Sequence, residues 1–164
     1  MLRLLLLRHA KSDWPEGVDD VDRPLTPRGA AQARDVGAYM QEHGLIPDRA
    51  VVSIAQRTRE TWAGVASPWQ EAPPVQFDDD VYAASARRLL QVIREQGGDA
   101  RSLLLVGHNP GVHDLVATLA AERDRVPLAY PTATLAVLEL PVDGWPEVDA
   151  GTARVERVVV KGSD

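Results

Sequence analysis

Near the start of the chain stands LRLLLLRHAKS, residues 2–12, and this stretch decides the fold. The apolar run Leu2–Leu7 has the length of a strand, and a run without alternation is typical of a strand buried on both faces. Arg8 and His9 follow it directly. Reactive side chains at the end of a buried parallel strand are typical of the ligand-binding edge of an α/β sheet.

Strands and helices alternate along the rest of the chain. Apolar runs predict further buried strands over 50–52 and 102–106, while helices are expected over about 27–43, 57–65, 86–96 and 112–121. The proline-rich segment 67–74 is expected to be a loop. Segments 132–140 and 152–161 alternate in part and predict two late strands, for which an antiparallel pair is one arrangement. The order predicts a single domain over residues 1–164, a three-layer α/β/α sandwich with a mostly parallel central sheet.

Composition limits the chemistry. The 164 residues include no Cys, which excludes disulfides, thiolate nucleophiles and zinc–thiolate sites. A net charge of −6 disfavours nucleic acid and anionic membrane as partners, so anion chemistry requires a local cluster of arginines. The apolar run Leu4–Leu7 is too short for a secretory or membrane segment, and we expect a cytoplasmic protein.

Two histidines and two arginines are expected to converge at one edge of the sheet. Arg8 and His9 follow the first strand, Arg57 follows the second, and His108 follows the strand over 102–106. The planar guanidinium group of arginine binds two phosphate oxygens at once, and a neutral imidazole can attack phosphorus without a metal. The leaving group then needs a proton, so a carboxylic acid is expected nearby.

The sequence resembles the histidine phosphatase superfamily (the phosphoglycerate-mutase-like branch). The resemblance is carried by LRHAKS at 7–12, LTPRGAAQA at 25–33, SIAQRTRET at 53–61 and VGHNPG at 106–111. The short length and the LTPRG segment are similar to the small SixA-type phosphohistidine phosphatases. In order along the chain, the resemblance covers about residues 2–120.

The resemblance implies roles for five residues. It makes His9 the phosphate-accepting nucleophile, Arg8 and Arg57 the phosphate clamp, and His108 a second pocket histidine that donates to the phosphoryl oxygens. Asn109 begins the turn into a helix and could offer its backbone N–H to the phosphate.

The proton donor is less well defined. Larger relatives carry a Glu some two dozen residues after the second arginine, where this chain has three aspartates, and we choose Asp80, then Asp79, with Asp13 as a further candidate. The acids at 19, 20 and 22 are expected to form a solvated surface, while Trp14 could line a substrate rim near the pocket mouth.

These residues predict a phosphatase without metal or cofactor that acts through a phosphohistidine intermediate. The substrate that the resemblance implies is a phosphohistidine protein; a phosphosugar or nucleotide handled by the same mechanism is the alternative. A second class is a metal-dependent hydrolase with His9, His108, His113 and aspartates as ligands, although adjoining arginines disfavour a dication. A third is a silent phosphate-binding module, disfavoured because all four pocket residues are present.

Overall fold

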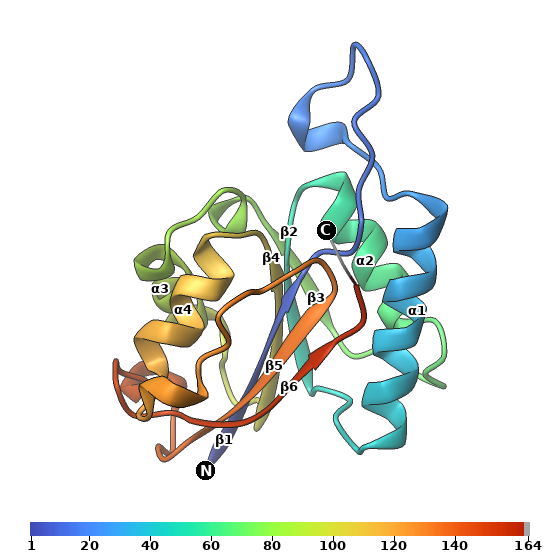
Figure 1. Ribbon diagram of the computed structural model, residues 1–164. Helices are drawn as coiled ribbons and strands as arrows, with labels where there is room; N and C mark the ends of the chain where they lie inside the picture. Colours follow the sequence, from blue (N-terminus) through green and yellow to red (C-terminus); the bar gives the residue numbers. More distant parts are fainter. Residues whose placement is uncertain (163–164) are drawn as a thin grey trace.

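A six-stranded sheet forms the middle layer of residues 1–162, the part of the chain that this computed structural model describes (Figure 1). Its strands lie side by side in the order β3-β2-β4-β1-β5-β6. Their bounds are Leu2–Arg8 for β1, Arg49–Ser53 for β2, Val75–Asp78 for β3, Ser102–Gly107 for β4, Thr134–Leu140 for β5 and Arg154–Val160 for β6.

The sheet is mostly parallel. The pairs β1–β4, β2–β4 and β2–β3 are parallel, whereas β5 runs antiparallel to both β1 and β6. Every residue from Leu4 to Leu7 has no solvent exposure, because β1 lies between β4 and β5 and both its faces are covered. The mostly parallel sheet is therefore confirmed, and the two late strands form an antiparallel pair.

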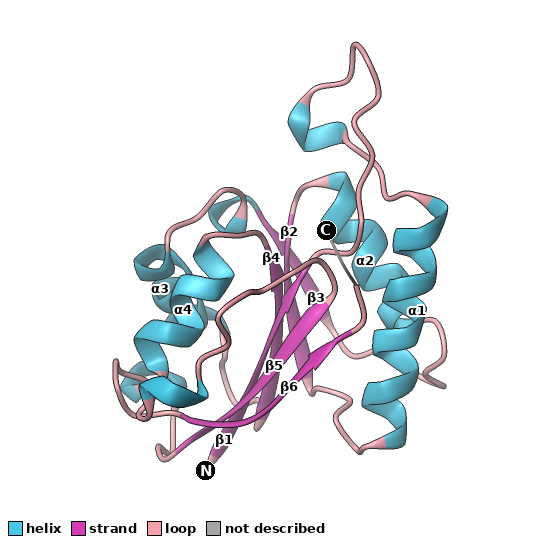
Figure 2. Cartoon of the chain, viewed as in Figure 1, coloured by secondary structure: helices cyan, strands magenta, loops and turns pink. Residues whose placement is uncertain are grey.

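Two layers of helices cover the sheet, as Figure 2 shows. Helices α1 (Pro27–Glu42) and α2 (Gln56–Ala66) pack on one face through an apolar cluster that includes Val36, Trp62 and Val65. Helices α3 (Ala86–Gln96) and α4 (Gly111–Leu119) pack on the opposite face, where Ile93 and Leu115 join a second cluster. The three-layer α/β/α sandwich predicted from the sequence is confirmed.

Side-chain caps begin two of the helices. The hydroxyl of Thr26 accepts a hydrogen bond from the Gly29 N–H at 3.0 Å, which satisfies a free donor in the first turn of α1. Ser85 likewise accepts from the Arg88 N–H at the start of α3.

Strand β3 was not predicted from the sequence. It has only four residues, lies at the edge of the sheet, and follows directly on the prolines of the 67–74 segment. Its residues are partly or fully exposed, so it lacks the apolar run that marks the central strands.

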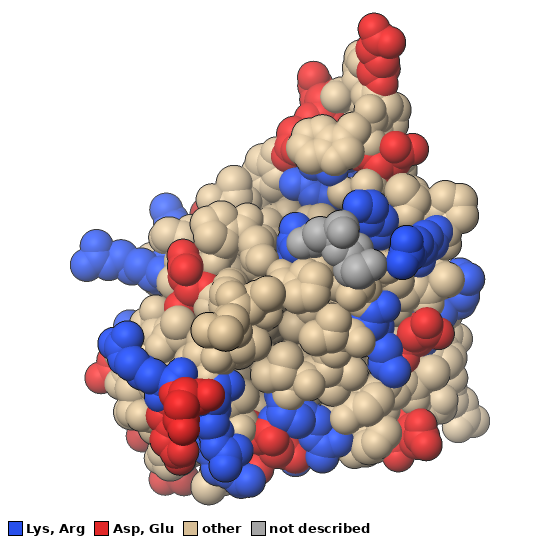
Figure 3. Space-filling model, viewed as in Figure 1, with Lys and Arg blue, Asp and Glu red and all other residues tan. Residues whose placement is uncertain are grey.

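The segment between β1 and α1 projects from the body of the molecule (Figure 1). It contains the short 3₁₀ turn Asp20–Asp22 and carries five acidic residues over positions 13–22. Acidic side chains accordingly gather on this projection in Figure 3. No helix in residues 1–162 has the length and apolar character needed to cross a membrane.

Candidate active site

The carboxyl ends of β1, β2 and β4 meet at one edge of the sheet. Parallel pairing places Arg8 beside Gly107, and the backbone N–H of His9 donates to the Gly107 carbonyl at 3.1 Å. Because His9 and His108 come directly after these paired strands, their rings lie close together, with centroids 5.4 Å apart.

A cavity of about 300 Å³ opens at this edge. It is lined by Arg8, His9, Lys11, Ser12, Trp14, Arg23, Arg57, His108, Asn109 and Thr132. The structure thus brings together five of the six residues that the sequence placed in the site. Trp14 also lies where a rim residue was expected.

His9 is a buried, neutral imidazole with one nitrogen available. Its Nδ1 lies 2.8 Å from the carbonyl oxygen of Ala10, which can only accept, so Nδ1 carries the proton and Nε2 keeps its lone pair. Burial, together with the positive charges of Arg57 and Arg8, lowers the pKa of His9 from 6.5 to about 4. The side chain is therefore uncharged at neutral pH, as a nucleophile must be.

His108 has one ring nitrogen bonded and the other without a partner. Its Nε2 lies 2.7 Å from the hydroxyl of Ser53 at the end of β2, while its buried Nδ1 has no hydrogen-bond partner among the described residues. Burial comes first, then the adjacent imidazole of His9, with which a second proton would be repulsive, and then the charge of Arg57; together they lower the pKa of His108 from 6.5 to about 3. If the Ser53 hydroxyl donates to Nε2, Nδ1 carries the proton and can donate to a ligand oxygen.

Arg57 comes from the first turn of α2 and is 6% exposed. Its Nη1 donates to the Asp20 carbonyl at 2.7 Å, and its Nη2 donates to the Asp20 carboxylate at 3.1 Å. The guanidinium therefore already holds an anionic group in the protein itself.

Arg8 and Asn109 are both tied to the segment that precedes β5. Arg8 Nη1 and Asn109 Nδ2 donate to the same carbonyl, that of Tyr130, at 3.1 Å and 2.8 Å. The Tyr130 hydroxyl in turn donates to the carbonyl of Leu6 within β1. This segment fixes the side chains on the β5 side of the cavity.

Known proteins resemble this chain over most of its length. The model of the histidine phosphatase superfamily (branch 1) matches residues 4–82. An uncharacterized protein of Mycobacterium tuberculosis is 32% identical over 154 residues, which cover 90% of this chain and 94% of that protein. The chain belongs to the histidine phosphatase superfamily.

Solved structures agree with this assignment. A candidate phosphohistidine phosphatase SixA from Nakamurella multipartitia superposes with a TM-score of 0.82 at 29% identity, covering 97% of this chain and 95% of the other. A candidate SixA from Agrobacterium tumefaciens gives 0.82 at 27% identity, covering 97% of each chain. A SixA protein histidine phosphatase complexed with tungstate shares the fold, with a TM-score of 0.80 over 98% of this chain and 97% of that one at 19% identity. The chain is thus a phosphatase of SixA type.

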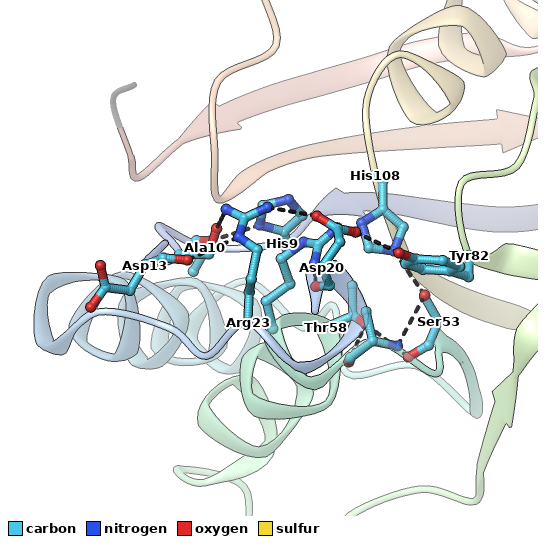
Figure 4. A network of polar contacts seen from close by, with 12 residues as sticks. His9, Ala10, Asp13, Asp20, Arg23, Ser53, Thr58, Tyr82 and His108 are labelled. Atoms are coloured by element: carbon cyan, nitrogen blue, oxygen red, sulfur yellow. Dashed lines mark hydrogen bonds and ion pairs between the residues drawn. The ribbon is translucent and has the colours of Figure 1, made fainter. Parts of the chain in front are cut away.

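Sequence reasoning missed two charged residues of this phosphatase site, Asp20 and Arg23 (Figure 4). The Asp20 carboxylate accepts hydrogen bonds from Tyr82, Arg23 and Arg57. These bonds, that from Tyr82 first, hold the pKa of the Asp20 carboxyl well below its usual range. Asp20 is half exposed, as expected of a surface acid, but it is also the counter-ion of two arginines, a role that the sequence did not predict.

The structure does not bring the expected proton donors into the cavity. The Asp80 carboxylate is more than half exposed and lies 3.8 Å from Arg88 on α3. Asp79 is exposed beside it, and Asp13 directs its carboxylate to the backbone N–H of Trp14. None of these three aspartates lines the cavity. Asp80 is paired with Arg88 of α3, and it is the nearby Tyr82 that approaches the site, with its ring centroid 5.6 Å from that of His108.

His113, a ligand in the metal-hydrolase alternative, is also directed elsewhere. Its Nε2 lies 2.7 Å from the carbonyl of Pro127, and its ring stacks on Tyr130. It is not among the lining residues of the cavity. The histidines that face the cavity in the described chain are His9 and His108, beside three arginines that would repel a dication.

Proposed function

We propose that this phosphatase removes the phosphoryl group of phosphohistidine in a partner protein, through a phosphohistidine intermediate on His9 and without a metal or other cofactor. One observation carries the choice of substrate. In the described chain no Asp or Glu lines the cavity, and the nearest carboxylate to the arginines, Asp20, is held in its ionised form. The site supplies a nucleophile and positive charge but no ready carboxylic acid.

The missing acid matters differently for different leaving groups. An alkyl phosphoester releases an alkoxide, which needs a proton from the enzyme in the transition state. The imidazole of phosphohistidine can take its proton from water on the ring nitrogen that is not phosphorylated, and it then leaves as neutral imidazole. A site without a protonated carboxyl therefore suits a phosphorus–nitrogen bond better than an alkyl ester.

The residues divide the work of the transfer. Nε2 of His9 attacks phosphorus with its lone pair, and its Nδ1–H remains bonded to the Ala10 carbonyl and holds the ring in place. Arg8 and Arg57 neutralise the phosphoryl oxygens, and His108 Nδ1 donates to one of them. Water then attacks the phosphorylated His9 and releases inorganic phosphate, while Nε2 recovers its lone pair.

The comparisons support this substrate at a coarser level. Two structures that share 27–29% of their sequence with this chain are candidate phosphohistidine phosphatases. Residues of the projecting segment line the cavity, among them the exposed Trp14, so a phosphoryl group carried on a folded protein can approach it from this side.

The test is to trap the intermediate. A protein phosphorylated on histidine with labelled phosphate is mixed with the enzyme in EDTA and quenched in alkali, because phosphohistidine is labile in acid. We expect label on His9 in the wild type and neither label nor turnover in His9→Ala, whereas His43→Ala, at an exposed histidine at the end of α1, behaves as wild type.

Other outcomes would redirect the proposal. Turnover with no label on any residue would show direct attack by water and refute the covalent route. A higher kcat/KM for phosphosugars or nucleotides than for the phosphorylated protein would assign the same mechanism to small phosphoesters.

A further inference from the structure

Trp14 differs from the other tryptophans of the chain. Trp62, Trp69 and Trp145 are at most 6% exposed and belong to the two apolar clusters, whereas Trp14 is 74% exposed and yet lines the cavity. Its indole therefore contributes little to the core. A large aromatic ring left in water at the mouth of a phosphoryl site is available to a ligand.

The indole is nevertheless held in position. The Arg23 guanidinium carbon lies 3.2 Å from the centroid of the Trp14 ring, a cation–π contact that covers one face. Arg23 is itself fixed, because it donates to the Asp13 carbonyl at 2.9 Å, the Asp20 carboxylate at 3.0 Å and the Ser12 hydroxyl at 2.7 Å. One face of the indole is thus anchored to the site and the other remains open.

The position of Trp14 matters because a leaving group must depart through the mouth of the cavity. His9 is only 7% exposed and lies at the floor of the cavity, while Trp14 is at its mouth. In phosphoryl transfer the attacking and leaving atoms are roughly in line on opposite sides of phosphorus. A phosphoryl group attacked by His9 therefore directs its leaving group outward, toward the mouth at which Trp14 stands.

We propose that the open face of Trp14 binds the planar ring of the leaving group, and so makes the enzyme selective for phosphoryl groups attached to such rings. The identity of the ring, the imidazole of phosphohistidine, rests on the proposed function. Stacked aromatic pairs change equilibria by about threefold to tenfold, and we expect a selectivity of this size.

The experiment compares two substrates with different leaving groups, and because these also differ in intrinsic reactivity, the ratio in each variant is read against the ratio in the wild type. Phosphoimidazole and phosphoramidate both carry a phosphorus–nitrogen bond, but only the first has a planar ring. We expect Trp14→Leu to lower the ratio of their kcat/KM values about threefold to tenfold, and Trp14→Phe to retain most of it. Ile46→Ala removes an exposed apolar side chain between α1 and β2, far along the chain from the site, and we expect it to leave both values unchanged.

The outcomes separate this inference from the proposed function. Equal losses on both substrates in Trp14→Leu would mean that Trp14 acts only by positioning Arg23, and unchanged values would mean that the ring does not contact it; either result overturns the inference. If the wild type hydrolyses neither compound, the phosphohistidine proposal fails. The same variants are then compared on phenyl phosphate and acetyl phosphate, where a selective loss on the phenyl ester still supports ring binding and an equal loss refutes it.

Discussion

At the scale of single residues, the Asp20 carboxylate binds guanidinium N–H groups that a phosphoryl oxygen would also bind. It lies 3.1 Å from Arg57 Nη2 and 3.0 Å from Arg23 Nη1, and it also accepts from Tyr82. Two anions cannot share one guanidinium without mutual repulsion. A phosphate entering the cavity must therefore compete with Asp20 for Arg57.

The variant Asp20→Asn tests this competition. It keeps an oxygen that can accept from Tyr82 but removes the negative charge, so we expect inorganic phosphate to inhibit about twofold to fivefold more strongly, a modest effect because the carboxylate is half exposed. The control is Asp22→Asn, which makes the same charge change on an exposed acid of the same segment. Phosphate inhibition constants that do not differ between the two variants would contradict the competition.

The residues of the site differ in whether their positions could be predicted from the sequence. His9, Arg8, Arg57 and His108 could be predicted because each follows a strand or begins a helix, and the topology then fixes where it lies. Asp20 could not, because it is one of several acids in an irregular segment whose path depends on contacts with Arg23 and Arg57. The i,i+3 spacing of Asp20 and Arg23 is the only local signal of their pairing.

At the scale of elements, α2 is tied to the loop that carries the nucleophile. The Thr61 hydroxyl accepts from the Ala10 N–H at 3.0 Å and donates to the Arg57 carbonyl one turn earlier at 2.7 Å. Ala10 is also the residue whose carbonyl orients the His9 ring. Thr61 is therefore a positioning residue that couples helix and nucleophile.

We expect Thr61→Val to lower kcat while KM changes little. The isosteric side chain leaves the Ala10 N–H buried without an acceptor, which costs about 1–3 kcal/mol of stability and frees the loop to move. Thr61→Ser restores the hydroxyl and should recover most of kcat. Steady-state kinetics and urea unfolding of the pair check this; equal kcat in Val and Ser variants would show that the tie does not position His9.

Elements differ in how far the sequence predicts them. The buried strands β1, β2 and β4 were evident as apolar runs, and α1 and α3 begin at Thr26 and Ser85, residue types that favour the start of a helix. β3 was missed because its ladder with β2, and not its own composition, holds it in the sheet. Pairing with a strand distant in the sequence, and not local strand propensity, therefore determines that this segment is a strand.

At the scale of the whole molecule, the buried histidines of the site make the stability of the fold depend on pH. His9 and His108 have folded pKa values of about 4 and about 3, against 6.5 for an exposed imidazole. At a pH between the folded and the unfolded pKa of each histidine, the unfolded chain binds a proton that the folded protein does not. The contribution of these two histidines to the free energy of unfolding is therefore complete above pH 6.5, and the free energy of unfolding falls as the pH drops toward 3.

Near pH 5 both imidazoles are protonated in the unfolded chain and neutral in the folded one, so we expect unfolding to take up about two protons. The slope of the unfolding free energy against pH, measured by urea titration between pH 7 and pH 4.5, reports this number. Replacing one of the pair in His108→Gln should reduce the uptake to about one proton, whereas Ile46→Ala, which removes an exposed side chain that does not titrate, should leave it at about two. A slope that is the same in all three proteins would show that the site histidines do not stay neutral in the folded state, and the neutral nucleophile at His9 would then lose its support.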